Sequence, residues 1–309
     1  YPAKNQQPCS TAGFSSRIRT ESCFLCQCSG LRSAVPLAVV EEILLNLPAH
    51  QVVRVCRLVC REWKELVDRA AHWRERCRRE GIQPQDPSRA PDGWCQFYFL
   101  TKKRRNLLKN PRAEDKLQGW KIVQNGGDRW VAEENRNPFP DETVTKCFVT
   151  SYGLCLKQQL IDLKKEGYNE AFMDQLQPHI KISDWYAPRF DCGCQYEISV
   201  ELLDRRKKPI CTFQPEKVFF QQWNDEPWCE VSRITLTVQL FPYNQTKSRC
   251  YCLCICSALF QMTHVFKDYG PGVQFIRFTH GGVDTQYWAG WYGIRVTNSS
   301  VEICPAEER

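Results

Sequence analysis

The chain has 309 residues, which is enough for one or two domains with adequate hydrophobic cores. Its formal net charge is +7, with 42 Lys and Arg against 35 Asp and Glu, and a balance this mild does not indicate nucleic-acid binding. No apolar run reaches the roughly 18 residues that span a bilayer, and the start of the chain lacks the basic, apolar and small-residue succession of a signal peptide. We therefore expect a cytoplasmic protein with no membrane insertion.

Two basic runs and the many cysteines are compositional features that need an interpretation. The runs 102–105 and 205–208 interrupt apolar patterns only briefly, so we interpret them as solvated faces and not as a nucleic-acid site. The 19 cysteines include dense clusters at 23–28 and 250–256. Zinc sites usually pair CxxC units at a set separation, and neither cluster has a second unit at such a spacing. We predict no metal site and no cofactor.

Hydrophobic periodicity begins at Val35; residues 1–34 show none, and we expect them to be an unstructured tail or an artefact of the gene model. Pro36 opens a first predicted helix and Pro48 ends it. The apolar face of this helix consists of Val40, Ile43, Leu44 and Leu47. A second helix is predicted from residue 52 to near Trp73, with apolar positions at Val52, Val53, Cys56, Val59, Cys60, Trp63 and Leu66. Two helices this short cannot bury all of this surface against each other, so we expect a partner.

The runs EEILLNLP and VCRLVCREWKELV, with the Pro-led start and the closing Trp, resemble an F-box, the segment that docks a substrate receptor to the Skp adaptor of a cullin-type ubiquitin ligase. The resemblance implies an F-box over residues 35–80 that binds the Skp adaptor and, through it, the cullin and RING subunits. The residues that it places at the adaptor interface, or in the helical core beneath it, are Pro36, Ile43, Leu44, Leu47, Pro48, Val59 and Trp63. The alternative is an ordinary helical hairpin packed inside its own domain.

The pattern changes after the F-box-like segment. The polar, Pro-rich run GIQPQDPSRAPDG and the amphipathic segment 94–105 predict a helical linker over residues 81–105. Short strand-like runs broken by glycine and turn residues follow: KIVQNGGDRW, KCFVTSY, QYEISVELLD, VQFIRFTHGG and YGIRVTNSSVEIC. In Gln195–Asp204 apolar and polar residues alternate, as in a half-buried strand. Many short strands and few long helices predict a β-sandwich.

Residues 106–305 resemble the F-box-associated domain of the sugar-recognising F-box proteins, above all in NLLKNP, CFVTSY, ISDWYAPRFDCGCQYEISVELLD and HGGVDTQYWAGWYGIRVTNSSV. The resemblance implies a galactose-binding-like jelly roll of antiparallel strands, and the best-known members bind the inner core of high-mannose N-glycans. The predicted fold class is therefore α+β and multidomain. A small all-α F-box and a C-terminal antiparallel β-sandwich are joined by a helical linker.

One segment departs from the pattern of that family. Members run from a W-x-E strand directly into a sequence like SHTF, whereas here residues 231–261 separate 228–230 from 262–266. Val231-Ser232 can be encoded by GTGAGT, and Gln261 by CAG after a pyrimidine-rich stretch, which are the two ends of an intron. We predict that residues 231–261 are a retained intron. The alternative is a real extra strand, which the alternating residues Ile234, Leu236, Val238 and Leu240 favour.

A candidate sugar site lies in a glycine-rich loop near the end of the chain. Glycans present apolar C–H faces that stack on aromatic rings, and hydroxyl edges that bond to carboxylates and amides. Tyr287 and Trp288 have glycines on both sides that let the backbone turn, so both rings can project at a rim of the sandwich. Spacing alone leaves open that both rings fill the core, as is expected of Trp291 and Tyr292.

The resemblance assigns four residues to glycan binding. Tyr287 and Trp288 match the aromatic pair that grips the glycan in the sugar-binding members. Tyr152 stands where those members carry an aromatic ring, and Asp191 matches a carboxylate that hydrogen-bonds the sugar. Ala289 departs from the family, because the strongest glycan binder has a lysine after the Tyr-Trp pair.

Three functions remain open. The preferred one is a non-catalytic substrate receptor of a Skp-cullin-F-box ubiquitin ligase that binds high-mannose N-glycans on misfolded glycoproteins for endoplasmic-reticulum-associated degradation. The second is the same receptor with a non-glycosylated protein as target. The third is an enzyme, which needs two flanking carboxylates for a glycosidase or a base beside a thiol for a cysteine enzyme. Its candidate residues, none of them in a recognisable catalytic motif, are Asp184, Asp191, Asp284, His179, His264 and His280.

Overall fold

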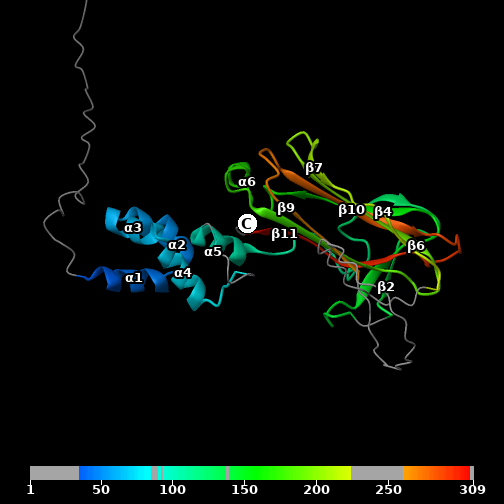
Figure 1. The fold of residues 1–309 in the computed structure, drawn as a ribbon, viewed down its shortest axis with the longest axis horizontal. Coiled ribbons are helices and arrows are strands. Elements are labelled where there is room, and N and C mark those ends of the chain that lie inside the picture. Colours follow the sequence, from blue (N-terminus) through cyan, green and yellow to red (C-terminus); the bar gives the residue numbers. More distant parts are fainter. Residues whose placement is uncertain (1–34, 85–89, 92, 137–138, 224–259, 307–309) are drawn as a thin grey trace, which may run out of the picture. The chain divides into compact units, whose positions relative to one another are not determined.

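The computed structural model describes residues 35–84, 90–91, 93–136, 139–223 and 260–306. The predicted tail and most of the predicted insertion, residues 231–259, lie outside the described residues. The chain divides into two compact units (Figure 1), one that ends at His72 and one that begins at Trp73. We name them the helical unit and the sandwich unit.

The helical unit consists of α1 (Leu37–Asn46), α2 (Ala49–Arg54), the 3₁₀ turn η2 (Cys56–Leu58), α3 (Arg61–Asp68) and the start of α4 (Ala70–Arg79). The first predicted helix is confirmed, with Pro36 directly before it. The second predicted helix is wrong as a single element, because it is broken into α2, η2 and α3, and Cys60 has an extended backbone. Its β-branched residues lower helix propensity, so tertiary packing decides where the chain turns.

The breaks let these short helices pack around one small apolar core. The turn η2 contacts both α2 and α3, and α1 contacts α3. The apolar residues buried in this unit are Val40, Leu44, Ala49, Val52, Cys56, Leu66 and Val67. Because this core is small, many other apolar side chains of the same helices stay exposed.

The predicted linker contains a helix, α5 (Trp94–Lys103), which belongs to the sandwich unit. Its residues Phe97 and Tyr98 are buried, and the ring of Tyr98 lies 5.5 Å from that of Trp73. The basic run 102–105 is more than a solvated face, because each of its side chains bonds to another residue of the sandwich unit. The partners are Glu80 for Lys102 (2.7 Å), the carbonyl of Gly167 for Lys103 (2.6 Å), Glu302 for Arg104 (2.6 Å) and Glu166 for Arg105 (2.5 Å).

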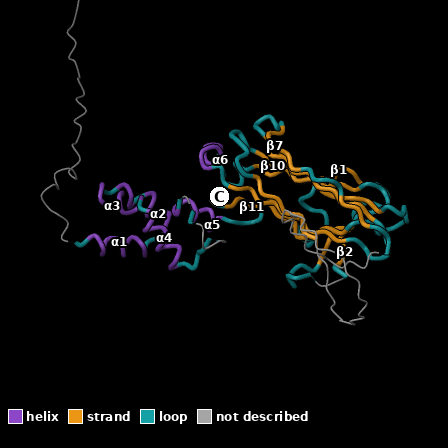
Figure 2. The backbone as a smooth tube through the Cα atoms, viewed as in Figure 1, coloured by secondary structure: helices purple, strands orange, loops and turns teal. Residues whose placement is uncertain are grey.

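The predicted antiparallel β-sandwich is confirmed: two sheets pack face to face (Figure 2). One sheet has the strand order β1-β4-β10-β6-β7, with β8 also paired to β6, and the other has the order β2-β3-β11-β5-β9. A short helix, α6 (Glu170–Leu176), connects β4 to β5. The strands are β1 (Lys121–Asn125), β2 (Val131–Glu134), β3 (Lys146–Val149), β4 (Cys155–Asp162), β5 (His179–Ala187), β6 (Cys194–Leu203), β7 (Pro209–Phe213), β8 (Val218–Phe220), β9 (Phe260–Phe266), β10 (Phe275–Asp284) and β11 (Arg295–Cys304).

The alternation predicted for residues 195–204 is confirmed in β6. Its apolar residues Tyr196, Ile198, Val200 and Leu202 are buried, and the polar residues between them are half-buried. They join one continuous core with buried side chains of the opposite sheet, such as Ile182. Period-two patterning therefore set the core-facing side of this strand.

A polar cluster crosses this apolar core from one sheet to the other. The carboxylate of Asp184 on β5 accepts hydrogen bonds from Nδ1 of His280 (2.5 Å), the hydroxyl of Tyr196 (2.6 Å) and the hydroxyl of Ser299 (2.7 Å). On the other side of the imidazole, Nζ of Lys157 lies 2.5 Å from Nε2 of His280. All five side chains are buried. Hydrogen bonding satisfies these polar groups where water does not reach them.

Burial sets the protonation of this cluster. Desolvation lowers the pKa of His280 to about 4, and desolvation also holds the pKa of Lys157 well below its usual value. The imidazole is therefore neutral at pH 7, donates from Nδ1 to Asp184 and accepts at Nε2. Nζ of Lys157 also lies 3.3 Å from the centre of the Trp120 ring.

Candidate functional site

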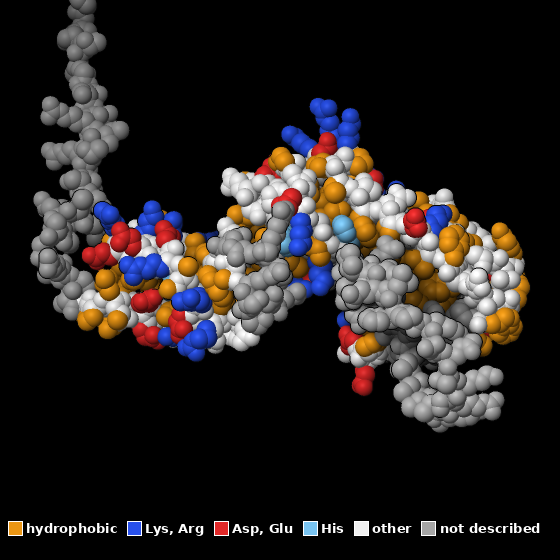
Figure 3. Space-filling model, in the orientation of Figure 1, with side chains coloured by type: hydrophobic (Ala, Val, Ile, Leu, Met, Phe, Trp, Pro, Cys, Tyr) orange, Lys and Arg blue, Asp and Glu red, His pale blue; other side chains and the backbone are white. Residues whose placement is uncertain are grey.

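Four loops meet at one end of the sandwich, which we name the loop end. They are the β1–β2, β3–β4, β5–β6 and β10–β11 connections. The strand register brings them together, because Gly282 near the end of β10 pairs with Cys155 at the start of β4, and Asp284 pairs with Cys194 at the start of β6. The β10–β11 loop forms the tip of this end in Figure 1, and hydrophobic side chains gather there in Figure 3.

Hydrogen bonds fix these loops to one another. Ser151 of the β3–β4 loop donates to the carbonyl of Gly290 (2.7 Å), and the amide of Gly290 donates to Asp128 of the β1–β2 loop (2.6 Å). The loops also pack closely, because a Cβ at Gly153 would lie 2.5 Å from the amide nitrogen of Gly127. Only glycine allows this approach of two backbones, so the loop end is a built surface and not a set of independent loops.

Tyr287 and Trp288 project from the β10–β11 loop. Their exposed fractions are 79% and 40%, so the alternative that both rings fill the core is wrong. The ring of Trp288 packs edge-on against Tyr292 with 5.6 Å between centres. Trp291 is exposed as well, against the expectation that it is a core residue, and its Nε1 donates to the carbonyl of Arg129 (3.0 Å). The loop therefore presents three rings, two of them held by neighbours.

Asp191 lies on the β5–β6 loop, where Arg189 holds it. The guanidinium donates to both carboxylate oxygens, at 2.5 and 2.9 Å, and these bonds hold the pKa of Asp191 below its usual value. The same guanidinium lies 4.5 Å from the ring centre of Tyr292, which is the ring that supports Trp288. The structure thus joins Asp191 to the aromatic loop. Each carboxylate oxygen keeps a second lone pair for a hydroxyl.

Tyr152, the fourth predicted site residue, lies in the β3–β4 loop of the same end. Its ring packs over Gly127, since Cδ1 would lie 3.1 Å from a Cβ there. Arg189 and Phe190 were not among the predicted site residues; Phe190 is a largely exposed ring directly before Asp191. Arg189 could have been found from its i, i+2 spacing to Asp191 in a loop, whereas no sequence signal separates Phe190 from a core residue.

The residues considered for catalysis differ in how deeply they are buried and in what they contact. Asp184 and Asp284 are fully buried and accept hydrogen bonds from protein groups, whereas Asp191 is only partly buried. His264 packs against Phe213 with 4.1 Å between ring centres. In the part of the chain that the structure describes, no group of three His, Cys, Asp or Glu side chains could hold a metal ion. Within that same part, no helix has both the length and the apolar character for crossing a membrane.

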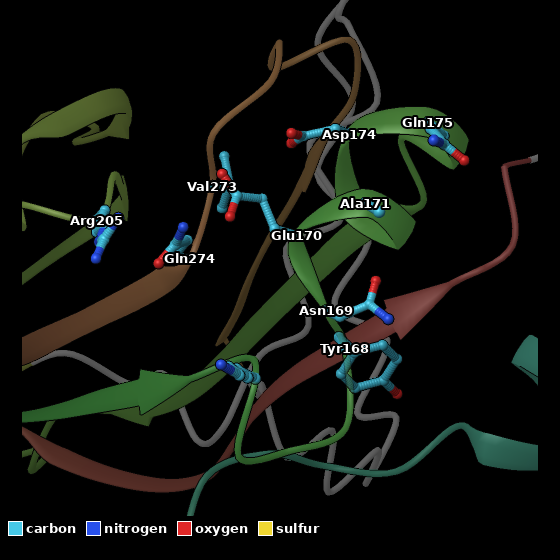
Figure 4. A pocket seen from close by; sticks show the side chains of 10 residues that line it. Tyr168, Asn169, Glu170, Ala171, Asp174, Gln175, Arg205, Val273 and Gln274 are labelled. Atoms are coloured by element: carbon cyan, nitrogen blue, oxygen red, sulfur yellow. The ribbon is translucent and has the colours of Figure 1, made fainter. Parts of the chain in front are cut away.

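A cavity of about 770 Å³ lies at the opposite end of the sandwich, between α6 and the β6–β7 and β9–β10 connections (Figure 4). Its walls carry both signs of charge: Glu170 and Asp174 come from α6, Arg205 from the β6–β7 connection, and Lys164 from the segment between β4 and α6. Lys and Arg side chains project beside it, from the turn that precedes β7 (Figure 3). Mixed charge gives this cavity no preference for an anion or a cation.

The helical unit carries a second exposed surface, which is aliphatic. Of the residues assigned to the adaptor, Pro36, Ile43, Pro48 and Val59 are exposed, and Leu47 and Trp63 are half-buried. Leu44 has no exposed surface, so it belongs to the helical core and not to the interface. The exposed aliphatic residues that were not assigned are Val35, Leu37, Val39, Val55 and Leu58. We name the exposed residues of these two groups, which include Ile43 and Val59, the aliphatic surface.

The fold defines an α+β protein in which a small helical module precedes a β-sandwich with an aromatic loop end. Two family models match it: "F-box-like" over residues 33–79, and "F-box associated region" over residues 98–234 and 254–303. F-box only protein 6 of Bos taurus is 44% identical over 273 residues, which are 87% of this chain and 91% of the relative. F-box only protein 44 of Homo sapiens is 42% identical over 275 residues, which are 88% of this chain and 96% of that relative. The chain belongs to this family of F-box only proteins with an F-box associated region.

The solved structures that match are much more distant than these relatives. The module TmCBM61, in complex with β-1,4-galactotriose, has a TM-score of 0.34 and 9% identity, and covers 64% of this chain and 97% of its own. The module CBM27-1 of Caldicellulosiruptor saccharolyticus, in complex with mannohexaose, has a TM-score of 0.33 and 9% identity. The match covers 66% of the present chain and 98% of that module. Similarity this low identifies neither a ligand nor a site for the present chain.

The family match leaves residues 235–253 uncovered, and these lie inside the predicted insertion. The last two residues of that insertion, Phe260 and Gln261, are the first residues of β9 and pair with Tyr186 and Trp185 of β5. Removing 231–261 would place Cys229 and Glu230 at these two strand positions. The strand can therefore form with or without the insertion, since strand pairing uses backbone groups.

Proposed function

We propose that the chain is the substrate-recognition subunit of a Skp-cullin-F-box ubiquitin ligase, acting in the cytoplasm. It binds high-mannose N-glycans on misfolded glycoproteins and presents them for ubiquitination and degradation. The observation that carries the proposal is the exposed Tyr287–Trp288 pair beside Asp191, on loops that are bonded to one another. The chain itself needs no catalytic group, because holding a substrate near a recruited conjugating enzyme raises its effective concentration there.

The proposed sugar contacts follow from the chemistry of the two exposed groups. The faces of Tyr287 and Trp288 stack on the C–H faces of a chitobiose unit, which are apolar. Asp191 accepts hydrogen bonds from sugar hydroxyls with the lone pairs that Arg189 leaves open. Tyr152 closes the site from the β3–β4 loop. Because Arg189 already fixes the carboxylate, sugar binding orders few additional side chains.

The aliphatic surface of the helical unit is the proposed binding face for the Skp adaptor. Ile43 and Val59 are about half exposed, at 49% and 54%, so burying the rest of each side chain releases about 1 kcal/mol, roughly half of the value for a fully exposed one. An exposed apolar surface of this kind suits a protein partner. The cullin and RING subunits are then reached through the adaptor.

A second function, a receptor for non-glycosylated proteins, is favoured by Phe190 and Trp291. Both rings are exposed at the loop end, and neither is among the four residues assigned to the glycan. Exposed aromatic residues are typical anchors of protein interfaces. On this alternative the same loop end contacts apolar side chains of an unfolded protein, and the glycan is dispensable.

The test is a binding measurement with an immobilised high-mannose glycoprotein and the same protein after enzymatic removal of its glycans. The chain is used in full and without residues 231–261, so that the insertion is examined together with binding. We expect binding that disappears with the glycan. Binding that persists on the deglycosylated protein supports the second function, and a folded chain that binds neither form contradicts both. Sequencing the mature transcript across Glu230 and Met262 decides whether the insertion exists.

A further inference from the structure

The base of the aromatic loop contains a buried carboxylate to which glycan binding assigns no role. Asp284, the last residue of β10, is fully buried. Its Oδ1 accepts hydrogen bonds from the amide of Gln286 (2.6 Å) and from the thiol of Cys192 (2.9 Å), and its Oδ2 accepts from the amide of Trp288 (2.9 Å). One side chain therefore bonds to two loops of the loop end.

The two amides that Asp284 binds lie on either side of Tyr287. The φ of Tyr287 is 59°, in the left-handed region that L side chains rarely adopt. An unsupported loop would leave this conformation, because a bulky residue is strained there. Bonds to the amides before and after Tyr287 hold the strained residue in place, and its ring projects outward as a result.

The thiol bond extends this support to the loop that carries Asp191. Cys192 directly follows Asp191, and burial, with the bond to Asp284, raises the pKa of its thiol to about 12. The thiol therefore stays protonated at pH 7 and remains a donor to the carboxylate. Asp284 thus touches both halves of the proposed site without being exposed to a ligand.

We infer that Asp284 is the positioning residue of the loop end, which holds Tyr287 and Trp288 in the projecting conformation and ties them to the Asp191 loop. Its effect on glycan affinity rests on the proposed function, whereas its effect on loop order does not.

A matched control exists at the opposite end of the same sheet. Asp204, which follows β6, accepts from the amides of Arg206 (2.7 Å) and Lys208 (2.8 Å), and the φ of Lys207 between them is 62°. Both carboxylates therefore bind the amides two and four residues after the aspartate, and the residue between these two amides is left-handed. The Asp204 turn carries basic side chains and no aromatic ring, so the two turns share a geometry and differ in what they present.

The first test is amide hydrogen exchange on the full chain with the variants Asp284→Asn and Asp204→Asn. In Asp284→Asn one of the two accepting oxygens becomes an NH₂ donor, which then faces the amide of Gln286 or of Trp288. In Asp204→Asn the remaining oxygen can still accept from both amides, because both bond to Oδ1. We expect exchange in the segment 285–292 to accelerate at least about tenfold in Asp284→Asn and to stay unchanged in Asp204→Asn. Unchanged exchange in a folded Asp284→Asn protein overturns the inference, whatever the chain binds. Cys192→Ala, which removes one neutral bond, is the milder variant if Asp284→Asn does not fold, and it predicts a smaller acceleration of the same segment; no acceleration overturns the inference.

The second test is a double-mutant cycle with Trp288→Ala, measured as binding to the immobilised high-mannose glycoprotein. If Asp284 acts through the aromatic loop, the double variant loses less affinity than the product of the two single losses. Losses that multiply mean that Asp284 acts elsewhere and overturn the positioning role. A wild-type chain that does not bind the glycoprotein is a failure of the proposed function, and the exchange experiment then decides the inference by itself.

Discussion

The helical unit and the sandwich unit both expose apolar side chains, but they hold them in different ways. In the helical unit the aliphatic surface and the core lie on the same short helices, as in the neighbours Ile43, exposed, and Leu44, buried. In the sandwich unit the exposed rings lie on loops whose shape depends on hydrogen bonds to Asp284, Asp128 and Arg129. The aliphatic surface therefore depends on helical periodicity and on the packing of α3 against α1, whereas the projecting rings depend on hydrogen bonds from a frame of polar groups.

The two cores also differ in how many hydrogen-bonded polar groups they contain. The core of the helical unit consists of apolar side chains such as Leu44, with His72 buried at the end of the unit, whereas the sandwich core contains the hydrogen-bonded cluster of Lys157, His280 and Asp184. Apolar packing is insensitive to pH, but buried ionisable groups make stability depend on it. Each unit can therefore be perturbed by a change that leaves the other unaffected.

The largest expected effect is that of Leu44→Ala. Removing a fully buried leucine from a small core costs about 2–5 kcal/mol of the free energy of unfolding, and we expect it to unfold the helical unit and to abolish adaptor binding. Ile43→Ala is the matched control, because its side chain is half exposed and its loss changes stability little. Urea denaturation, followed by a probe placed in the helical unit, measures the free energy of unfolding of both variants. Equal costs at the two positions would contradict the division into core and surface.

The second prediction concerns the pH dependence of the sandwich unit. The pKa of His280 is lowered from 6.5 to about 4 by burial, so the unfolded chain binds more protons than the folded one between these pH values. Stability therefore falls as the pH decreases through this window, by about 3 kcal/mol for this group. Lys157, whose pKa is also lowered by burial, acts in the same direction.

The measurement is the free energy of unfolding of the sandwich unit between pH 4 and 7, in the wild type and in His280→Asn. We expect the slope that His280 causes to be absent in the variant. His50→Asn, a change at an exposed histidine of the helical unit, is the control and leaves the slope unchanged. A full slope in His280→Asn refutes the assignment to this residue.

The third prediction separates the two exposed surfaces. We expect Trp288→Ala to weaken glycoprotein binding by about 2 kcal/mol, roughly thirtyfold, because the ring supplies a contact that alanine cannot replace. Adaptor binding stays unchanged. Ile43→Asp has the reverse pattern, since it places a charge in the aliphatic surface. Pull-down with the adaptor and with the glycoprotein measures both variants, and a loss of both activities in either one would show that the surfaces are not independent.

The smallest expected effect is that of Ala289→Lys. Ala289 is exposed next to Trp288, and the resemblance noted in the sequence places a lysine here in the strongest glycan binder. An added ammonium donor contributes about 0.5–1.5 kcal/mol when it bonds to a sugar hydroxyl. Titration calorimetry should show affinity raised several-fold, and Ala289→Met, of similar length without the charge, is the control. An equal gain with Met would assign the effect to apolar contact.

By itself, the sequence determined the fold class, the alternating faces of strands such as β6, and the first helix, because period and punctuation are local properties. It also assigned Tyr287, Trp288, Asp191 and Tyr152 to the site, through motifs that the resemblance interprets. Tertiary structure decided the rest. Whether Tyr287 and Trp288 project or fill the core depends on the bonds to Asp284, and whether Leu44 is core or surface depends on α3 packing against α1. The proposed site combines loops far apart in the chain, which the strand register of the sheet brings together.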